Sequence, residues 1–274
     1  MEPTQTDKVV ILARGLGTRM RRQAEDAGLS QQQEAVAQTG VKALVPVGRP
    51  FLDYVLSALA EAGYRRVCLV VAPDHAALRD YYGRQMRPRR LGIEFAVQPQ
   101  PRGTADAVAA AEAFAGDDPF LMVNSDDYYP LEALAALRAQ EGAAVALFEQ
   151  EAMLAGGNIA EERLRQFSVG QIDGEDSLER IVEKPTEEVL AALPRPLWVS
   201  MNCWRFTPAI FEACRNIEPS PRGELEVTDA VQYAIDKLGE PFRVLRVRGA
   251  VLDMTSRSDI APIAARLAGV EVDF

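Results

Sequence analysis

The side chains of this chain that could carry chemistry are mainly carboxylates, lysines and arginines, because other reactive groups are scarce. The 274 residues contain one histidine, His75, and three scattered cysteines, Cys68, Cys203 and Cys214. A histidine-based catalytic triad and a histidine-rich metal site are therefore nearly excluded. We expect buried thiols at the cysteines and the start of a surface helix at His75. Any reaction must use carboxylates, Lys and Arg, with or without a hard cation.

A glycine-containing loop follows the first apolar run. In the stretch VVILARGLGTRMRR, Val9 to Arg22, the run ends at Gly15 and Gly17, and three arginines follow within four positions. Glycine lets backbone N–H groups approach an anion, and Arg19 can hold phosphate oxygens with paired donors. A tight turn is the alternative reading of GxG alone. The loop matches neither GxxxxGK[ST] nor GxGxxG, whose sixth position is Met20 here.

Two adjacent carboxylates, Asp126 and Asp127, follow another apolar run, PFLMVN at 119–124. Carboxylates at the end of a buried strand are costly unless they are solvated at a site or paired with a cation. This position therefore favours a functional role.

Alternating strand and helix patterns must position these groups. Short, nearly continuous apolar runs predict strands at 8–13, 66–72, 93–98, 119–124 and 143–150. Helical spacing is seen at 51–64, 75–83, 104–116 and 131–142. This alternation predicts an α/β fold with a doubly wound, mostly parallel sheet. Ligands bind such sheets at the carboxyl ends of the strands, where the glycine loop falls.

The pattern changes after residue 150. The segment 166–185 predicts a hairpin around Asp173 and Gly174, and 197–206 predicts another strand. Further helices are expected after Thr207, Thr228 and Ser258. The segment 20–41 could be a helix over the glycine loop. Without repeats or long linkers, the chain 1–274 is expected to form one domain.

The overall composition limits the classes of partner. The chain has a net charge of −10, 48% hydrophobic residues and 26% charged residues. This is typical of a soluble globular protein and argues against a duplex-DNA binder. No apolar run approaches the roughly 20 residues of a membrane span, and MEPTQTDK lacks a signal-peptide pattern. We expect no nucleic-acid or membrane partner and a cytoplasmic location.

The loop LARGLGTR, residues 12–19, resembles the LAxGxGTR signature of the sugar-1-phosphate nucleotidyltransferases, such as glucose-1-phosphate thymidylyltransferases and uridylyltransferases. The resemblance continues in order along nearly the whole chain. The stretch VKALVPVGRPFLDYVLSALAEAG is similar to PKxLxPVxGKPxIxYxLxxLxxAG, and VQPQPRGTADAV to the base-binding segment. FLMVNSDDYY, RIVEKP and RGELEVTDAV resemble the LxxxGD strand end, the VEKP hairpin and the RGExxxTD element.

The resemblance implies a Rossmann-like nucleotidyltransferase fold with a small hairpin-containing sugar-binding part. Residues 1–150 would form the nucleotide-binding half and 151–274 the sugar-phosphate-binding half. The implied reaction couples an NTP and a sugar 1-phosphate to give an NDP-sugar and pyrophosphate, by Mg²⁺-dependent in-line attack on the α-phosphate. The attacking phosphate is already an anion, so cations rather than a general base are needed. A homo-oligomer is left open.

The resemblance also assigns residues to roles. The nucleotide-binding set is Leu12, Ala13, Arg14, Gly15, Gly17, Thr18, Arg19, Gln98, Gly103 and Thr104. The sugar-phosphate-binding set is Ser168, Glu183, Lys184, Ser200 and Asn202. The catalytic set is Arg19, Lys42, Asp126 and Lys184, and Mg²⁺ is assigned to Asp126 and Asp253. Taken alone, Lys42 could be a solvated loop lysine, Lys184 part of a surface ion pair, and Asp253 a turn residue.

Several positions depart from the family pattern. Arg14 replaces a small residue, Ser168 and Asn202 replace glycines, and the element around Asp253 lacks its Trp and Gly. GTADAV and SMNCWRF look most like ADP-glucose pyrophosphorylases, whereas VQPQP and RGELEVTD look more like thymidylyl- or uridylyltransferases. The NTP and the sugar therefore stay open.

Three alternative functions are considered. One is nucleotidyl transfer to a non-sugar phosphate, such as phosphocholine or an alditol phosphate. Another is a catalytically silent, nucleotide-sugar-binding regulatory subunit, against which the retained charged residues argue. The third is an NAD-binding oxidoreductase, which is the least favoured of the three because the sequence lacks GxGxxG.

Overall fold

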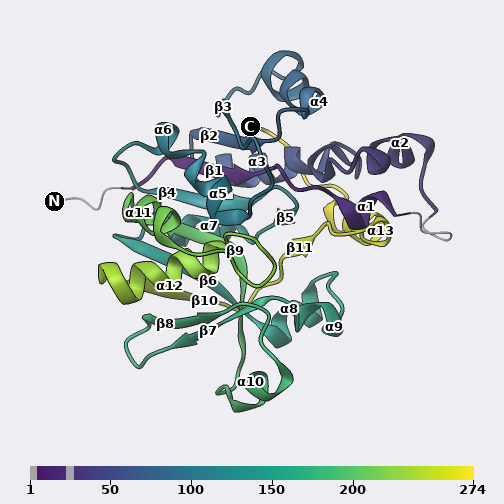
Figure 1. The fold of residues 1–274 in the computed structure, drawn as a ribbon. Coiled ribbons are helices and arrows are strands. Elements are labelled where there is room, and N and C mark those ends of the chain that lie inside the picture. The colour runs from purple at the N-terminus through teal and green to yellow at the C-terminus, as the bar shows by residue number, and fades with distance from the viewer. Residues whose placement is uncertain (1–4, 23–27) are drawn as a thin grey trace.

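The computed structural model describes residues 5–22 and 28–274. Within them, a nine-stranded sheet has the order β10-β6-β9-β4-β1-β2-β3, and the hairpin β7–β8 joins it through β9 (Figure 1). The bounds are β1 Lys8–Leu12, β2 Arg66–Val71, β3 Gly92–Val97, β4 Phe120–Asn124, β6 Ala143–Glu149, β7 Ser168–Ile172, β8 Leu178–Val182, β9 Trp198–Phe206 and β10 Phe242–Val247. Strand β9 is antiparallel to β4, β6 and β7, whereas the other pairs along the main order are parallel. The predicted mostly parallel sheet is confirmed.

Helices cover both faces of the sheet, which explains why its central strands are apolar throughout. Val9 and Ile11 of β1 point to a core shared with α3 (Phe51–Glu61) and α7 (Leu131–Arg138). Val10 points to the opposite core, which includes α5 (Thr104–Ala109), α11 (Ala209–Asn216) and α12 (Val227–Leu238). Successive side chains of a strand alternate between faces, so a strand covered on both faces needs no polar residues.

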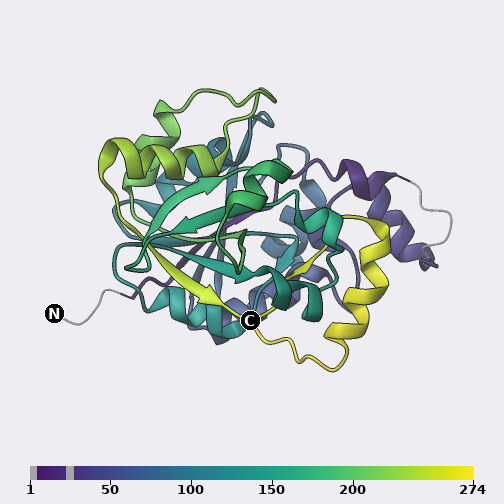
Figure 2. The same ribbon diagram turned by 90° about the horizontal axis from the view of Figure 1, so that it is seen from below.

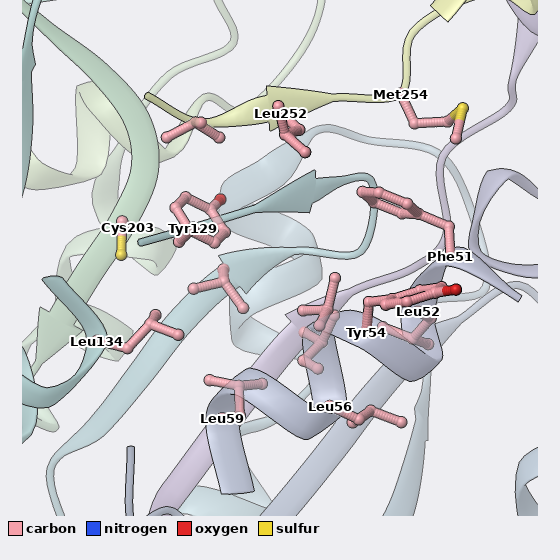
Figure 3. Packing of buried hydrophobic residues seen from close by; sticks show 14 of the residues in the cluster. Phe51, Leu52, Tyr54, Leu56, Leu59, Tyr129, Leu134, Cys203, Leu252 and Met254 are labelled. Atoms are coloured by element: carbon pink, nitrogen blue, oxygen red, sulfur yellow. The ribbon is translucent and has the colours of Figure 1, made fainter. Parts of the chain in front are cut away.

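The first of these cores extends to the C-terminal part of the chain. Figure 3 shows Leu59 of α3 on one side of Tyr129, and Leu252 and Met254 on the other. Tyr129 is 1% exposed, and its hydroxyl donates to the carbonyl of Met201 over 2.7 Å. The segment around Leu252 is therefore packed into the core.

The remaining elements are short, and several lie near the carboxyl end of β1. They are α1 Thr18–Arg21, α2 Gln31–Thr39, η1 Lys42–Leu44, α4 Ala76–Asp80, η2 Tyr81–Gln85, α6 Glu112–Ala115, β5 Asp127–Tyr128, α8 Gln150–Gly156, α9 Glu161–Leu164, α10 Glu187–Ala192, β11 Leu252–Asp253, η3 Arg257–Asp259 and α13 Ile260–Leu267. Figures 1 and 2 both place α13 beside α1 and α2. No helix of the described residues is long and apolar enough to cross a membrane.

Some predicted helices have different bounds. The single helix predicted at 104–116 is wrong: α5 and α6 are separated at Ala111, whose φ of −96° and ψ of 6° leave the helical region. The segment 75–83 instead contains α4 and then a turn of π-helix, η2, with His75 preceding α4 as expected. Helix α12 begins one residue before Thr228, because the Thr104 hydroxyl accepts from the N–H of Val227 over 2.8 Å. Helix α13 begins at Ile260, after Ser258 as predicted, and Ser258 itself lies in the short helix η3.

The predicted hairpin, the strand at 197–206 and the buried free cysteines are confirmed. Strands β5, β10 and β11 were not predicted. The expected helix over the glycine loop is confirmed as α2, and residues 23–27 of that segment lie outside the described residues. Arg257, 3% exposed, donates to the carbonyl of Met20 and pairs with Glu34 of α2. It thereby connects the C-terminal segment to α1 and α2.

A buried carboxylate fixes the start of α3. Asp53 is fully buried and accepts hydrogen bonds from the hydroxyls of Tyr82 (2.8 Å) and Tyr81 (3.2 Å) and from Arg49 (3.2 Å). Burial raises the pKa of Asp53 above its ordinary value of 3.8, and these three donors counteract that rise. Ionisation of Asp53 therefore reduces stability as pH increases from 3.8 through the pKa of the folded state.

We predict that Tyr82→Phe lowers the free energy of unfolding by about 1.5–3 kcal/mol at pH 7, because a hydrogen bond to a buried charge is lost. The loss should be smaller near pH 4, where folded Asp53 takes up its proton. The matched control is Tyr54→Phe, next to Asp53 in α3, because the Tyr54 hydroxyl donates to the carbonyl of Val47 and not to Asp53. That variant should lose less, and equally at both pH values. Urea unfolding measures both, and a pH-independent loss for Tyr82→Phe would contradict the assignment.

Candidate functional site

The glycine loop lies between β1 and α1 and contacts the end of α2. Gly17 has φ of 59°, a region that L side chains rarely adopt. A Cβ on Gly17 would overlap the backbone of Gly40, the residue after α2. A Cβ on Gly15 would have no heavy atom within 4 Å, so there is room for a side chain at this position. Glycine is therefore required at Gly17, where the backbone approaches that of Gly40 closely, and no such contact requires it at Gly15.

This loop forms one wall of a cavity of about 410 Å³. The cavity opens at the carboxyl ends of β1 and β4, as expected for a doubly wound sheet. All ten residues assigned to the nucleotide by resemblance line it: Leu12, Ala13, Arg14, Gly15, Gly17, Thr18, Arg19, Gln98, Gly103 and Thr104. Lys42 and Asp126 line it as well.

Gln98 is held in one orientation at the far wall of this cavity. It is 2% exposed, and its side-chain NH₂ donates to the carbonyl of Gly103 (3.0 Å) and to Asp106 (2.8 Å). Two acceptors around the nitrogen fix the amide, so its oxygen is the end that remains to accept from a ligand. The Nε of Arg14 donates to the Gln98 backbone carbonyl over 3.3 Å, which places Arg14 beside Gln98.

A second cavity, of about 170 Å³, adjoins the first. All five residues assigned to the sugar phosphate line it: Ser168, Glu183, Lys184, Ser200 and Asn202. Arg19, Asn124 and Asn202 line both cavities. A ligand in one cavity would therefore lie next to a ligand in the other.

Two residues of the second cavity have unusual backbone geometry. Lys184 has φ of 44° and Asn202 φ of 54°. Positive φ in residues other than glycine is costly and clusters at functional sites, and asparagine tolerates it best among non-glycine residues. Positive φ at Asn202 agrees with the glycine that the resemblance implies at this position. The Ser168 hydroxyl donates to Glu183 over 2.7 Å, which joins β7 to the end of β8.

Lys42 and Asp126 form a close ion pair beside the first cavity. The Lys42 Nζ lies 2.7 Å from Asp126 Oδ2, and both side chains are largely buried. Burial alone would lower the pKa of Lys42, but the carboxylates of Asp126, Asp253 and Asp127 hold it above its ordinary value. Lys42 is therefore a fixed positive charge and not a solvated loop lysine.

The short strands β5 and β11 bring Asp253 to the same place. They pair antiparallel with Asp253 opposite Asp127, and the N–H of Met254 donates to the carbonyl of Asp126 over 2.8 Å. Asp127 and Asp253 are 3% and 4% exposed. Burial, and then neighbouring carboxylates, raise the pKa of both, that of Asp127 by a large amount. The carboxylates are thus destabilised by one another.

A hard divalent cation fits this donor set. The described residues contain no group of three or more His, Cys, Asp or Glu side chains arranged to hold a metal on their own. Mg²⁺ does not require one, because it keeps waters and is bound by one or two carboxylates together with substrate phosphates. Its charge would offset the repulsion around Asp126 and Asp253. Asp126 lines the first cavity, whereas Asp253 lines neither of the two.

Comparison with known proteins assigns the fold and the family. Residues 8–247 match the family described as nucleotidyl transferase. The chain belongs to this family. The resemblance predicted from the motifs is therefore confirmed.

Individual relatives of this nucleotidyl transferase have related names. It is 30% identical to the low-salt glycan biosynthesis nucleotidyltransferase Agl11 of Haloferax volcanii, covering 90% of this chain and 66% of that protein. It is 29% identical to a glucose-1-phosphate thymidylyltransferase of Streptomyces antibioticus, covering 93% and 65%. The chain thus spans just under two thirds of the length of these relatives. A UDP-glucose pyrophosphorylase structure with UDP-glucose shares the fold, with a TM-score of 0.75 at 21% identity over 97% of this chain and 100% of that one.

Some residues of the nucleotidyl transferase site were not predicted from the sequence. Asn124, the last residue of β4, lines both cavities, and its amide donates to Asp127 over 2.9 Å. Its position two residues before Asp126, at the end of the same apolar run, could have indicated it. Arg163 of α9 lines the second cavity and lies 3.5 Å from Asp253. No motif marks Arg163, because only the fold brings it there.

We predict that Gly17→Ala lowers the free energy of unfolding by more than about 2 kcal/mol, since positive φ alone costs roughly 1–2 kcal/mol for alanine and overlap with Gly40 adds to it. Gly15→Ala, two residues away in open space, is the matched control and should stay within about 0.5 kcal/mol of the parent protein. Thermal unfolding of both variants measures this. Equal stability of the two variants would show that the loop does not need close contact with Gly40.

Proposed function

We propose that this nucleotidyl transferase couples an NTP and a sugar 1-phosphate, forming an NDP-sugar and releasing pyrophosphate. The observation that carries the proposal is the pair of adjoining cavities that share Arg19, Asn124 and Asn202. The glycine loop suits a triphosphate in the first. The second combines Lys184 for a phosphate with Glu183 and Ser168 for hydroxyl groups. The names of the relatives agree with this reaction.

The geometry suits a direct displacement. An oxygen of the sugar phosphate attacks the α-phosphorus, the bond to the bridging oxygen of the β-phosphate breaks, and pyrophosphate leaves with the electron pair. The attacking oxygen is already anionic, so no proton must be removed. His75 lines neither cavity, which agrees with a reaction that needs no general base. The main requirement is to hold two polyanions together.

Charged residues of the chain meet that requirement. We assign Lys42 to the β- and γ-phosphates, where its charge favours departure of pyrophosphate. Arg19, which lines both cavities, is assigned to the phosphates at the junction. Asp126 and Asp253 would hold Mg²⁺, which when bound supplies positive charge to the phosphate oxygens.

The division of labour between 1–150 and 151–274 is part of this proposal. Asp253 belongs to the second half but pairs with Asp127 of the first, so the halves share the proposed reaction centre. A cytoplasmic location also stays an expectation of this proposal, and a homo-oligomer is left open.

A substrate panel tests the function. Five NTPs are combined with common sugar 1-phosphates, phosphocholine and an alditol phosphate, each with Mg²⁺, and pyrophosphate is detected. We expect release with at least one sugar 1-phosphate. Release with only a non-sugar phosphate would change the acceptor class, and nucleotide binding without any release would favour a regulatory subunit.

The two separated aspartates provide a mutational test. Asp126→Asn and Asp253→Asn keep side-chain volume and remove one charge each, so we expect folding to survive and kcat to fall about 100- to 1,000-fold. The double variant should be little worse than the worse single one, since residues acting as a unit are not additive. Activity and Mn²⁺ affinity measured by electron paramagnetic resonance check this. Full activity and unchanged Mn²⁺ affinity of Asp253→Asn would leave Asp253 as a turn residue.

A further inference from the structure

Arg163 is a partly buried cation of the second cavity to which no motif assigns a role. It lies in α9, and its side chain is 19% exposed. Among the described residues lining that cavity, the cationic side chains are Arg19, Arg163 and Lys184. Arg19 is shared with the first cavity. Arg163 and Lys184 are therefore the cations specific to the second cavity.

The guanidinium of Arg163 is held in a fixed orientation by Asp259. Its Nη1 donates to both carboxylate oxygens of Asp259, over 2.9 and 3.1 Å. Asp259 itself accepts from the backbone N–H groups of Thr255 (3.1 Å) and Ser256 (2.7 Å) and from the amide of Asn158 (3.1 Å). This network joins the segments 158–163 and 255–259, and it leaves Arg163 little rotational freedom.

One edge of the same guanidinium lacks good partners. The Nε of Arg163 is shielded from solvent and has no hydrogen-bond partner in the structure. The Nη2 has only long contacts, both of 3.5 Å, to the carbonyl and the carboxylate of Asp253. Nε–H and Nη2–H point from one planar edge, with the spacing of two phosphate oxygens. A buried donor without a partner is costly, so a ligand that accepts from this edge would be stabilised.

The charge balance of the cavity points to the same ligand. A phosphate monoester carries close to two negative charges at neutral pH. Lys184 supplies one positive charge, but Glu183 and Asp127 line the cavity too. Arg222 lies 3.4 Å from Glu183 and 2.6 Å from Glu226 and does not line this cavity. Asp259 compensates charge at the Nη1 side of Arg163, so what Arg163 offers the phosphate is the pair of donors on its other edge, in a cavity that it lines.

We propose that Arg163 binds the phosphate group of the acceptor substrate with its Nε–Nη2 edge, opposite Lys184. The inference rests on the proposed function for the identity of the acceptor, but it assigns the phosphate site independently of the reaction. Arg163 then determines specificity: a phosphorylated acceptor is bound and an unphosphorylated sugar is rejected. Asp259 is the positioning residue that orients it.

The test compares Arg163→Gln and Arg163→Lys with Arg165→Gln, a control two residues away. Arg165 is half exposed and pairs with Glu161 over 2.6 Å on the surface. Inorganic phosphate is the probe, titrated into each protein and followed by ³¹P NMR. We expect Arg163→Gln to bind phosphate about 10- to 100-fold more weakly, the effect of losing one charged bidentate contact. Arg163→Lys should be intermediate, and Arg165→Gln unchanged.

Asp259→Asn separates this role from a purely structural one. Asp259→Asn weakens the network but keeps the guanidinium. If Asp259→Asn and Arg163→Gln lower the melting temperature by a similar amount, Asp259→Asn should weaken phosphate binding less. Each of three results would overturn the proposal: an equal loss of phosphate affinity in the two variants, unchanged phosphate binding in Arg163→Gln, or no phosphate binding by the parent protein.

Steady-state kinetics with the substrates found in the panel add a second readout. Arg163→Gln should raise KM for the sugar phosphate at least tenfold and leave KM for the NTP within about twofold. The reverse pattern would contradict the assignment. If phosphate binding depends on Arg163 but the protein releases no pyrophosphate, the proposed function is contradicted and the phosphate site is supported.

Discussion

The antiparallel pairing of β5 with β11 is the contact on which the rest of the site depends. Each strand is only two residues long, yet the pair places Asp253 opposite Asp127 and ties Met254 to Asp126. The chain then continues to Arg257, which contacts the carbonyl of Met20 in α1. The short β5–β11 pairing therefore sets the position of Asp253. It also sets the position of Arg257, which contacts α1 directly after the glycine loop. Leu252 and Met254 anchor this pairing in the core.

The cost of this arrangement is electrostatic. Asp127 and Asp253 are buried close to one another and to Asp126, and burial together with mutual repulsion raises their pKa values. Lys42 compensates Asp126, and Arg163 approaches Asp253. A protein selected only for stability would replace such a cluster with apolar residues. Its retention is explained if phosphates and a cation complete the charge balance, so that binding energy is gained where folding energy is lost.

The sheet and the glycine loop could be predicted from the sequence because each depends on a local pattern of residues that favours one structure. Apolar strands such as Val9–Leu12 and the turn at Gly17 follow from side-chain and backbone preferences alone. Lys42 and Lys184, which the motifs singled out, line the first and the second cavity, and their roles stay predictions. The β5–β11 pairing could not be predicted, since two residues carry no periodicity. Arg163 was missed for a related reason: its partners Asp253 and Asp259 lie some 90 residues away in sequence.

The stereochemistry at the α-phosphorus tests direct transfer between the two cavities most directly. An NTP analogue with sulfur in place of one α-phosphate oxygen is chiral at that phosphorus, and ³¹P NMR identifies the configuration of the NDP-sugar formed from it. A single in-line displacement by the sugar phosphate predicts inversion. Retention would mean two displacements through a nucleotidylated side chain, and it would contradict the account of adjoining cavities that bring two substrates together without a nucleophile from the protein.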